Sequence, residues 1–119
     1  MAVSKAFVAY VQELLAPLGP VRVKSMFGGA GVYADELMFA LVFGDDLYLR
    51  VDAVTEATFR EAGAAPFTYR MKDGREVQMS YWRVPDEALD GPEQAEPWAR
   101  LALEAAMRHH AAKAKGRRR

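Results

Sequence analysis

Hydrophobic residues recur along the chain first at helical spacing and then at the alternating spacing of β-strands. The first stretch, residues 4–18, places its apolar side chains on one face of a helix, and Ser4 is suited to cap the start of that helix. Gly19 and Pro20 predict where the helix ends, because glycine favours the left-handed cap and proline cannot continue a helix. The apolar face consists of Phe7, Val11, Leu14, Leu15 and Leu18.

Three runs of strand character follow and are separated by acidic or glycine-containing turns. The second run is apolar on both faces, which predicts a position at the centre of a sheet. The segment before them, residues 21–27, fits either a short edge strand or an extended linker. The three runs cover residues 30–34, 37–43 and 47–51.

The second half of the chain repeats this change from helix to strand. Asp52 is placed to cap a short helix over about residues 53–62, which would pack through Phe59 and end at Gly63. Alternating strands are then expected over 67–71 and 77–84.

Asp73 and Gly74 join these two strands and are the strongest short hairpin signal in the sequence. Pro85 ends the second strand, and Pro92 fits the first turn of a last helix. The core side of that helix is expected to carry Trp98, Leu101, Ala102 and Ala105.

The order of elements is one helix, three or four strands, a helix, two strands and a helix. Almost every connection between strands is short enough for a hairpin, so the sheet should be mostly antiparallel. The sequence therefore predicts an α+β fold, a two-layer sandwich in which helices pack on one face of a five- to six-stranded sheet. We expect a single domain over residues 1–112.

Charge is distributed unevenly, although the net charge is zero. Residues 1–112 carry 11 basic and 16 acidic side chains, a net charge of −5, and residues 113–119 carry +5. The acidic body makes a polyanion-binding groove in the folded domain improbable. The basic tail either adds salt-dependent affinity for nucleic acid or simply complements the end of the preceding helix. Both interpretations remain open for the five basic residues of this tail, which are Lys113, Lys115, Arg117, Arg118 and Arg119.

The composition limits both the chemistry and the cellular location that we expect of this protein. The sequence contains no cysteine, which excludes disulfides and thiolate chemistry. The N-terminus does not resemble a signal peptide, and the longest apolar run, residues 37–43, is too short to cross a bilayer. We expect a cytoplasmic protein without membrane contact.

No group of residues indicates a reaction. The glycines around residues 28–31 lead into another strand rather than a helix, so a structural bend is favoured over a phosphate cradle. His109 and His110 are adjacent, which does not suit a metal pair on a helix, and we interpret them as part of a solvated helix terminus. The carboxylates are dispersed, and no serine has a nucleophile-elbow context. The sequence therefore predicts no enzyme activity, metal or cofactor.

Aromatic and basic residues lie close together in three places, and they could form a surface on which single-stranded nucleic acid stacks. These groups are Tyr48 with Arg50, Tyr69 with Arg70 and Lys72, and Tyr81 with Trp82 and Arg83. Aromatic residues on strands more often form core or cross-strand packing pairs, and we favour packing.

The order and spacing of these segments resemble the N-terminal domain of the TfoX/Sxy family of competence regulators. The resemblance covers roughly residues 20 to 105 and implies a role in positive regulation of competence genes, with no catalytic residues to transfer. Full-length members carry a second, helical domain, so this chain resembles a stand-alone single-domain member. The positions that carry the resemblance are Met26, Phe27, Gly28, Gly29, Gly31, Tyr33, Phe39, Tyr48, Arg50, Ser80, Tyr81 and Pro85.

The first functional hypothesis is a non-enzymatic interaction module of transcription regulation, with a protein partner and a capacity to form a homodimer. A face or edge of the sheet that no helix covers would receive that partner. The second hypothesis is weak, nonspecific nucleic-acid binding through the basic tail. The third is a small-molecule site or an active site in a pocket between sheet and helices.

Overall fold

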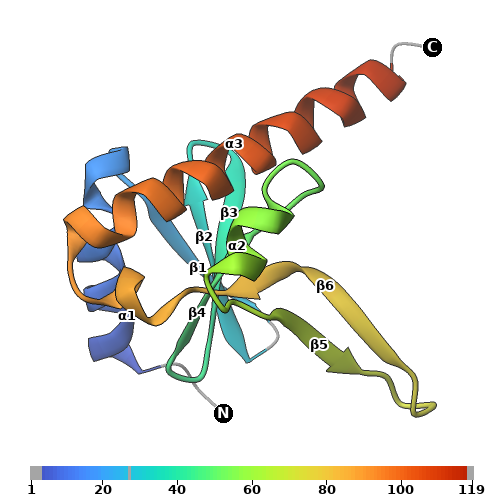
Figure 1. Cartoon of the computed structure of the whole chain (residues 1–119), viewed down its shortest axis with the longest axis horizontal. Helices are drawn as coiled ribbons and strands as arrows, with labels where there is room; N and C mark the ends of the chain where they lie inside the picture. Colours follow the sequence, from blue (N-terminus) through green and yellow to red (C-terminus); the bar gives the residue numbers. More distant parts are fainter. Residues whose placement is uncertain (1–3, 27, 118–119) are drawn as a thin grey trace.

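The chain forms an antiparallel sheet that is crossed on one side by a long C-terminal helix (Figure 1). This computed structural model describes residues 4–26 and 28–117, apart from the side chains of residues 26, 69, 78 and 114–117. Over these residues, the strands are β1 (Arg22–Met26), β2 (Gly29–Ala34), β3 (Leu37–Phe43), β4 (Asp46–Arg50), β5 (Pro66–Arg70) and β6 (Glu76–Arg83). The helical segments are α1 (Lys5–Leu14), α2 (Glu56–Glu61), α3 (Pro92–Arg117) and two 3-10 turns, η1 (Ala16–Leu18) and η2 (Asp86–Leu89). The predicted α+β fold is confirmed.

The first helix forms where its hydrophobic pattern predicts it. The Ser4 hydroxyl oxygen accepts a hydrogen bond from the backbone N–H of Phe7 at 3.2 Å, which satisfies one of the free donors at the start of α1. Val11 and Leu14 are fully buried. Gly19 follows η1 with a φ of 102°, the left-handed geometry that ends the helical segment.

The six strands lie in the order β1-β2-β3-β4-β6-β5, and every adjacent pair is antiparallel. The doubly apolar strand β3 lies at the centre, as predicted. The segment that fitted a strand or a linker is the edge strand β1. Between β2 and β3 the register shifts after Val32 pairs with Ala40, and the extra residue Phe39 turns into the core with no exposed surface.

One side of the sheet and α3 form the core. Ala40 and Val42 of β3 pair with Leu49 and Leu47 of β4, and all four side chains are at most 2% exposed. Helix α3 contacts β3 and β4. It presents small side chains to the sheet, such as the fully buried Ala102, which lets the two layers approach closely.

The short second helix begins later than predicted. It covers Glu56–Glu61 rather than about 53–62, because the Asp52 carboxylate accepts hydrogen bonds from the backbone N–H groups of Val54 and Thr55 and thereby closes a turn before the helix. Phe59 is fully buried, as predicted, and meets Trp98 of α3 edge to face with ring centroids 5.1 Å apart.

The glycine pair before β2 serves two different physical needs. Gly28 has a φ of 79°, which a turn requires and other residues rarely adopt. Gly29 has no such φ, but a Cβ atom there would lie 2.4 Å from the carbonyl oxygen of Val42. The structural bend is therefore made by Gly28, and Gly29 allows a close backbone approach.

Candidate functional site

A paired arginine and tyrosine lie at the centre of the candidate site. Arg50 of β4 and Tyr81 of β6 are direct partners in the sheet. The Arg50 guanidinium donates a hydrogen bond to the Tyr81 hydroxyl at 3.3 Å, and its central carbon lies 5.4 Å from the centre of the tyrosine ring. The Tyr81 hydroxyl in turn donates to the backbone carbonyl of Met38 at 3.3 Å. Tyr81 is 7% exposed, so this arrangement fixes the direction of a half-buried arginine.

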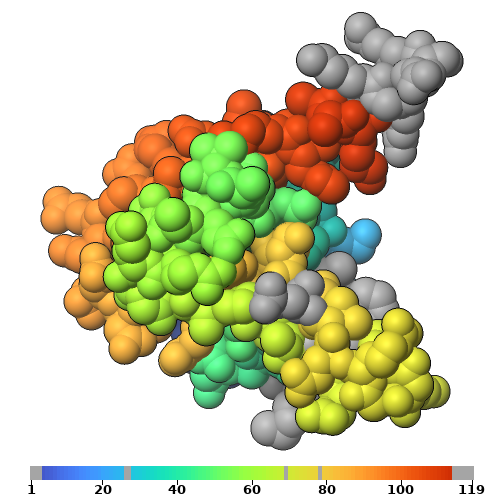
Figure 2. All heavy atoms as spheres, turned by 45° about the vertical axis from the view of Figure 1, so that its right-hand side comes forward, coloured from blue at the N-terminus to red at the C-terminus, as the bar shows by residue number. Residues whose placement is uncertain are grey.

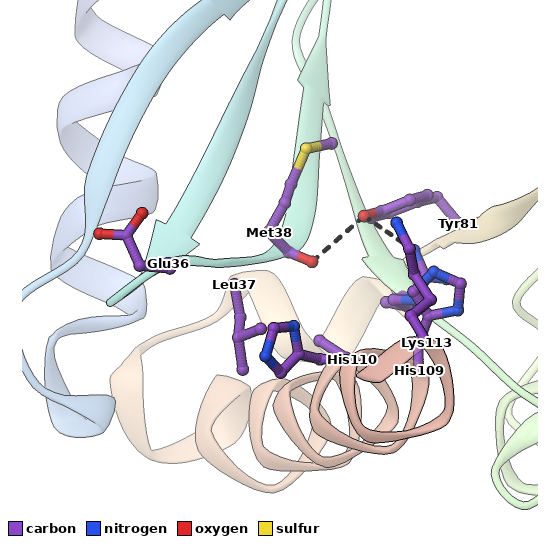
Figure 3. Close-up of a pocket in the computed structure, with 9 residues that line it drawn as sticks. Glu36, Leu37, Met38, Tyr81, His109, His110 and Lys113 are labelled. Carbon is purple, nitrogen blue, oxygen red and sulfur yellow. Dashed lines mark hydrogen bonds between the residues drawn. The ribbon is translucent and has the colours of Figure 1, made fainter. Parts of the chain in front are cut away.

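This pair lines a pocket between the sheet and the C-terminal half of α3 (Figure 3). The pocket has a volume of about 300 Å³. Figure 3 shows His109 and Lys113 on the Tyr81 side and His110 close to Leu37. Its walls come from the turn between β2 and β3, from β3, β4, β6 and from α3. The lining residues are Glu36, Leu37, Met38, Arg50, Tyr81, Ala106, His109, His110 and Lys113.

Positive charge predominates in the pocket. Arg50 and Lys113 are basic, and Glu36 is the one acidic residue among the lining side chains of the described chain. The charge of Arg50 is the main reason that the pKa of His109 lies below its usual value, with burial, Lys113 and His110 acting in the same direction. Burial raises the pKa of Tyr81, so its hydroxyl keeps its proton. The site is suited to receive an anion.

The histidines of α3 do not belong to a cluster of metal ligands among the described residues. Over residues 4–26 and 28–117, no group of three or more histidine, aspartate or glutamate side chains could hold a metal ion. His109 and His110 lie in the interior of α3, seven or more residues before Arg117, rather than at a helix terminus as interpreted from the sequence. Both are exposed and face the pocket.

A second feature is the hairpin of β5 and β6, which stands out from the body of the molecule (Figure 1; yellow in Figure 2). Three of its apolar side chains, Met71, Val77 and Met79, are 36%, 38% and 38% exposed, and we call them the hairpin patch. Asp73 holds the turn by accepting a hydrogen bond from the backbone N–H of Arg75 at 3.0 Å, and Gly74 has a φ of 91°. The predicted hairpin is confirmed, but much of it lies outside the core.

Aromatic side chains join the base of the hairpin to the sheet. Phe67 of β5 packs against Tyr48 at 4.8 Å and Phe43 at 5.6 Å between ring centroids. Tyr48 lies between the buried residues Leu47 and Leu49, so alternation places it on the side of the sheet opposite to them. The packing interpretation of this aromatic residue is favoured by these contacts. Phe43 remains 40% exposed.

The residues that carry the family resemblance are distributed over the whole sheet. Among those whose side chains the structure describes, only Arg50 and Tyr81 line the pocket. Others have structural positions: Phe39 is in the core, Ser80 offers its carbonyl to Val51 N–H at 2.8 Å, and Pro85 is buried before η2. Met26 ends β1, Gly31 and Tyr33 lie in β2, and Phe27 lies outside the described residues.

The basic segment is partly described. Lys113 is exposed and lines the pocket, and the backbone of α3 stays helical through Lys115 and Arg117. Arg118 and Arg119 lie outside the described residues. Sequence reasoning did not connect Lys113 with His109, although their spacing of four residues places both on one face of a helix.

Fold and pocket together define a two-layer α+β domain with a small basic pocket and an exposed apolar hairpin. Residues 13–106 match the TfoX N-terminal domain, and the chain belongs to that family. This confirms the resemblance noted in the sequence. Within the part of the chain that the structure describes, no helix has the length and hydrophobicity needed to cross a membrane.

Three relatives with known names share part of the sequence. Protein Sxy of Escherichia coli (strain K12) is 37% identical over 78 residues, which cover 66% of this chain and 36% of that protein. The DNA transformation protein TfoX of Haemophilus influenzae (strain ATCC 51907 / DSM 11121 / KW20 / Rd) is 33% identical over 73 residues, 60% of this chain and 34% of that protein. DNA transformation protein TfoX1 of Aliivibrio fischeri (strain ATCC 700601 / ES114) is 38% identical over 55 residues, 46% of this chain and 26% of that protein. The matched segments thus span between 26% and 36% of these relatives.

Proposed function

We propose that this chain is a non-enzymatic interaction module of bacterial transcription regulation that binds a protein partner through its β5–β6 hairpin. The observation that carries this proposal is the hairpin patch of Met71, Val77 and Met79, whose apolar side chains are each more than a third exposed. Apolar side chains gathered on a projecting element favour a partner that removes them from water.

The geometry of the hairpin favours a partner that adds an extended segment. β5 is the last strand in the sheet order, so one of its edges has no neighbouring strand among the described residues. An extended peptide can complete the hydrogen bonds of such an edge, while pockets and patches beside it select side chains. Two of the three patch residues are methionines, whose flexible side chains adapt to varied apolar surfaces.

The relatives support a regulatory role. Two of them are named DNA transformation proteins. We propose that this chain also acts in DNA transformation, and that it does so in the cytoplasm by contact with another protein. A second copy of the chain is one candidate for that partner, and sedimentation velocity of the purified protein distinguishes a dimer from a complex with a different protein.

A variant of the hairpin patch tests the proposal. Met79→Asp places a charge in the patch, so we expect the partner to be lost and transformation frequency in cells to fall to that of a strain lacking the gene. Val54→Asp is the matched control, because Val54 is 70% exposed and lies outside the hairpin. Full transformation frequency with a folded, normally expressed Met79→Asp protein would contradict the proposal.

A second candidate function, nucleic-acid binding, is favoured by the continuation of α3 through Arg117, which carries basic residues past position 113 on a regular helix. Fluorescence anisotropy with a labelled oligonucleotide across a salt series measures it. Removal of residues 113–119 should abolish binding and its salt dependence. Equal binding by the shortened chain would end this proposal.

A further inference from the structure

Arg50 differs from most arginines of this chain in its contacts. Within residues 4–26 and 28–117, six arginines form ion pairs with carboxylates, and Arg50 is not among them. Its guanidinium contacts the hydroxyl and the ring of Tyr81 instead. A half-buried arginine that is held in place without a carboxylate has N–H groups available for an incoming anion.

We propose that the pocket between the sheet and α3 binds a small organic phosphate, with Arg50 and Lys113 holding the phosphate group and Leu37, Met38 and Ala106 contacting the apolar part of the ligand. This ligand site is separate from the hairpin patch and does not depend on the proposed protein partner.

The number and kind of donors favour phosphate over a carboxylate. A phosphate monoester carries close to two negative charges at neutral pH and three acceptor oxygens, which matches two basic side chains with several donors. Tyr81 donates its only hydroxyl proton to Met38, so it accepts from Arg50 and orients the guanidinium rather than binding the ligand itself. Because Arg50 is already oriented, less conformational entropy is lost when the anion binds.

The volume of the pocket sets the size of the ligand. About 300 Å³ is at the lower end of the range for small-molecule sites. Apolar and aromatic side chains next to the cations provide contacts for one ring or a short carbon chain. A phosphate attached to a single aromatic ring satisfies both requirements.

The pKa of His109 provides an independent measure of ligand binding in the pocket. The groups that face it are Arg50 from β4 and His110 and Lys113 from α3, while Glu36 lines the pocket from the β2–β3 turn. Arg50 contributes most to the lowering of the His109 pKa. A bound dianion offsets that positive charge, so binding should raise the His109 pKa.

Nuclear magnetic resonance titration of the full chain tests the proposal with phenyl phosphate, inorganic phosphate and the neutral compound benzyl alcohol. We expect saturable shifts at β4, β6 and the C-terminal half of α3, with phenyl phosphate binding more tightly than inorganic phosphate and benzyl alcohol not binding. No saturable shift with phenyl phosphate would overturn the proposal. Equal affinity for the two phosphates would overturn the organic part of it.

Three variants assign the binding to the named side chains. Arg50→Gln and Lys113→Gln should each weaken phenyl phosphate binding about tenfold or more. Arg60→Gln is the matched control, since Arg60 also lies over an aromatic ring, 5.0 Å from the centre of Trp82, but does not line the pocket. Lys113 is exposed on α3, so its variant keeps the fold and decides the test even if Arg50→Gln proves unstable. Unchanged affinity in a folded Lys113→Gln protein would overturn the proposal.

A thymidine oligonucleotide of twelve residues distinguishes a small ligand from the phosphates of a nucleic acid. Because Lys113 belongs both to the pocket and to the basic segment, the two ligands are distinguished through Arg50. Under the proposal, Arg50→Gln weakens phenyl phosphate binding and leaves any binding of the oligonucleotide unchanged. Arg50-dependent binding of the oligonucleotide without binding of phenyl phosphate would instead assign the pocket to nucleic acid and overturn the proposal.

Discussion

Arg108 of α3 binds the carboxylate of Asp52 with two parallel hydrogen bonds, 2.7 Å from Nε to Oδ2 and 3.0 Å from Nη2 to Oδ1. Asp52 also accepts hydrogen bonds from the backbone N–H groups of Val54 and Thr55. One carboxylate therefore closes the turn after β4 and attaches α3 to it, across 56 positions of sequence. This contact lies next to the strand end that positions Arg50.

Asp52→Ala should lower the free energy of unfolding at neutral pH by about 1–2 kcal/mol, because the two backbone hydrogen bonds that close the turn after β4 are lost. The Arg108 hydrogen bond is the largest of the effects that hold the pKa of Asp52 below its usual value. The stabilisation that the ionised Asp52 carboxylate contributes is therefore complete above about pH 4. It is lost as the pH falls through the lowered pKa of Asp52 in the folded state. Urea unfolding at several pH values measures this.

In that experiment the wild-type protein and Asp52→Ala should become more similar in stability as the solution is acidified. Asp45→Ala is the control, because Asp45 is exposed in the β3–β4 turn. A stability difference between wild type and Asp52→Ala that stays constant from pH 7 to pH 2 would contradict the assigned cause.

Arg108→Gln tests the other side of the contact. It should raise the pKa of Asp52 toward its ordinary value, since the guanidinium that favours the ionised carboxylate is removed. Carboxyl carbon chemical shifts, followed against pH, report this value directly. Arg100→Gln, which breaks only a pairing with Glu96 inside α3, should leave the Asp52 pKa unchanged.

Gly29→Ala should destabilise the protein by about 1–3 kcal/mol, the range for overpacked sites. The new Cβ would lie 2.4 Å from the Val42 carbonyl oxygen, so the backbone of β2 or β3 must move. Gly91→Ala is a matched control, because its Cβ would meet the flexible end of Gln94 at 2.9 Å. Thermal unfolding of the two variants should show a large loss for Gly29→Ala and a small one for Gly91→Ala.

Phe59→Ala should cost about 3–5 kcal/mol of stability, because it removes a fully buried ring and its edge-to-face contact with Trp98. Val54→Ala, in the same connecting segment but 70% exposed, should have little effect. Chemical denaturation followed by tryptophan fluorescence measures both. A Phe59→Ala protein as stable as Val54→Ala would mean that α2 does not hold α3 on the sheet.

Arg50→Gln should raise the pKa of His109 toward 6.5, its ordinary value, because Arg50 is the main cause of its lowering. Imidazole proton resonances titrated with pH give the value for each histidine. Arg60→Gln removes an equal charge outside the pocket and should leave His109 unchanged. No change with Arg50→Gln would place Arg50 too far from His109 to share a ligand with it.

Much of the fold could be predicted because its signals are local. The Ser4 cap, the stripe through Val11 and Leu14 and the Asp73–Gly74 hairpin each depend on residues within one or two turns of one another. The predicted start of α2 was too early. The sequence does not show that the Asp52 carboxylate accepts hydrogen bonds from the N–H groups of Val54 and Thr55 and from Arg108.

The candidate site was harder to predict, for a physical reason. Arg50 and Tyr81 were identified as motif positions, but their pairing with each other depends on the crossover that places β6 beside β4. His109 was interpreted as part of a solvated terminus, since the sequence does not reveal that α3 runs on past it to Arg117. The exposure of Met79 was also hidden, because alternation predicts which side chains share a face and not whether that face is covered.

The sequence alone determined the order of helices and strands, the central position of β3 and the family, because hydrophobic periodicity, caps and turn residues act over short distances. Tertiary structure alone decided that β6 pairs with β4, that Asp52 anchors α3, and that Arg50, Tyr81, His109 and Lys113 line one pocket. These contacts join residues from distant parts of the chain. They depend on how the strands pair and on how the long helix packs against the sheet, which no local pattern encodes.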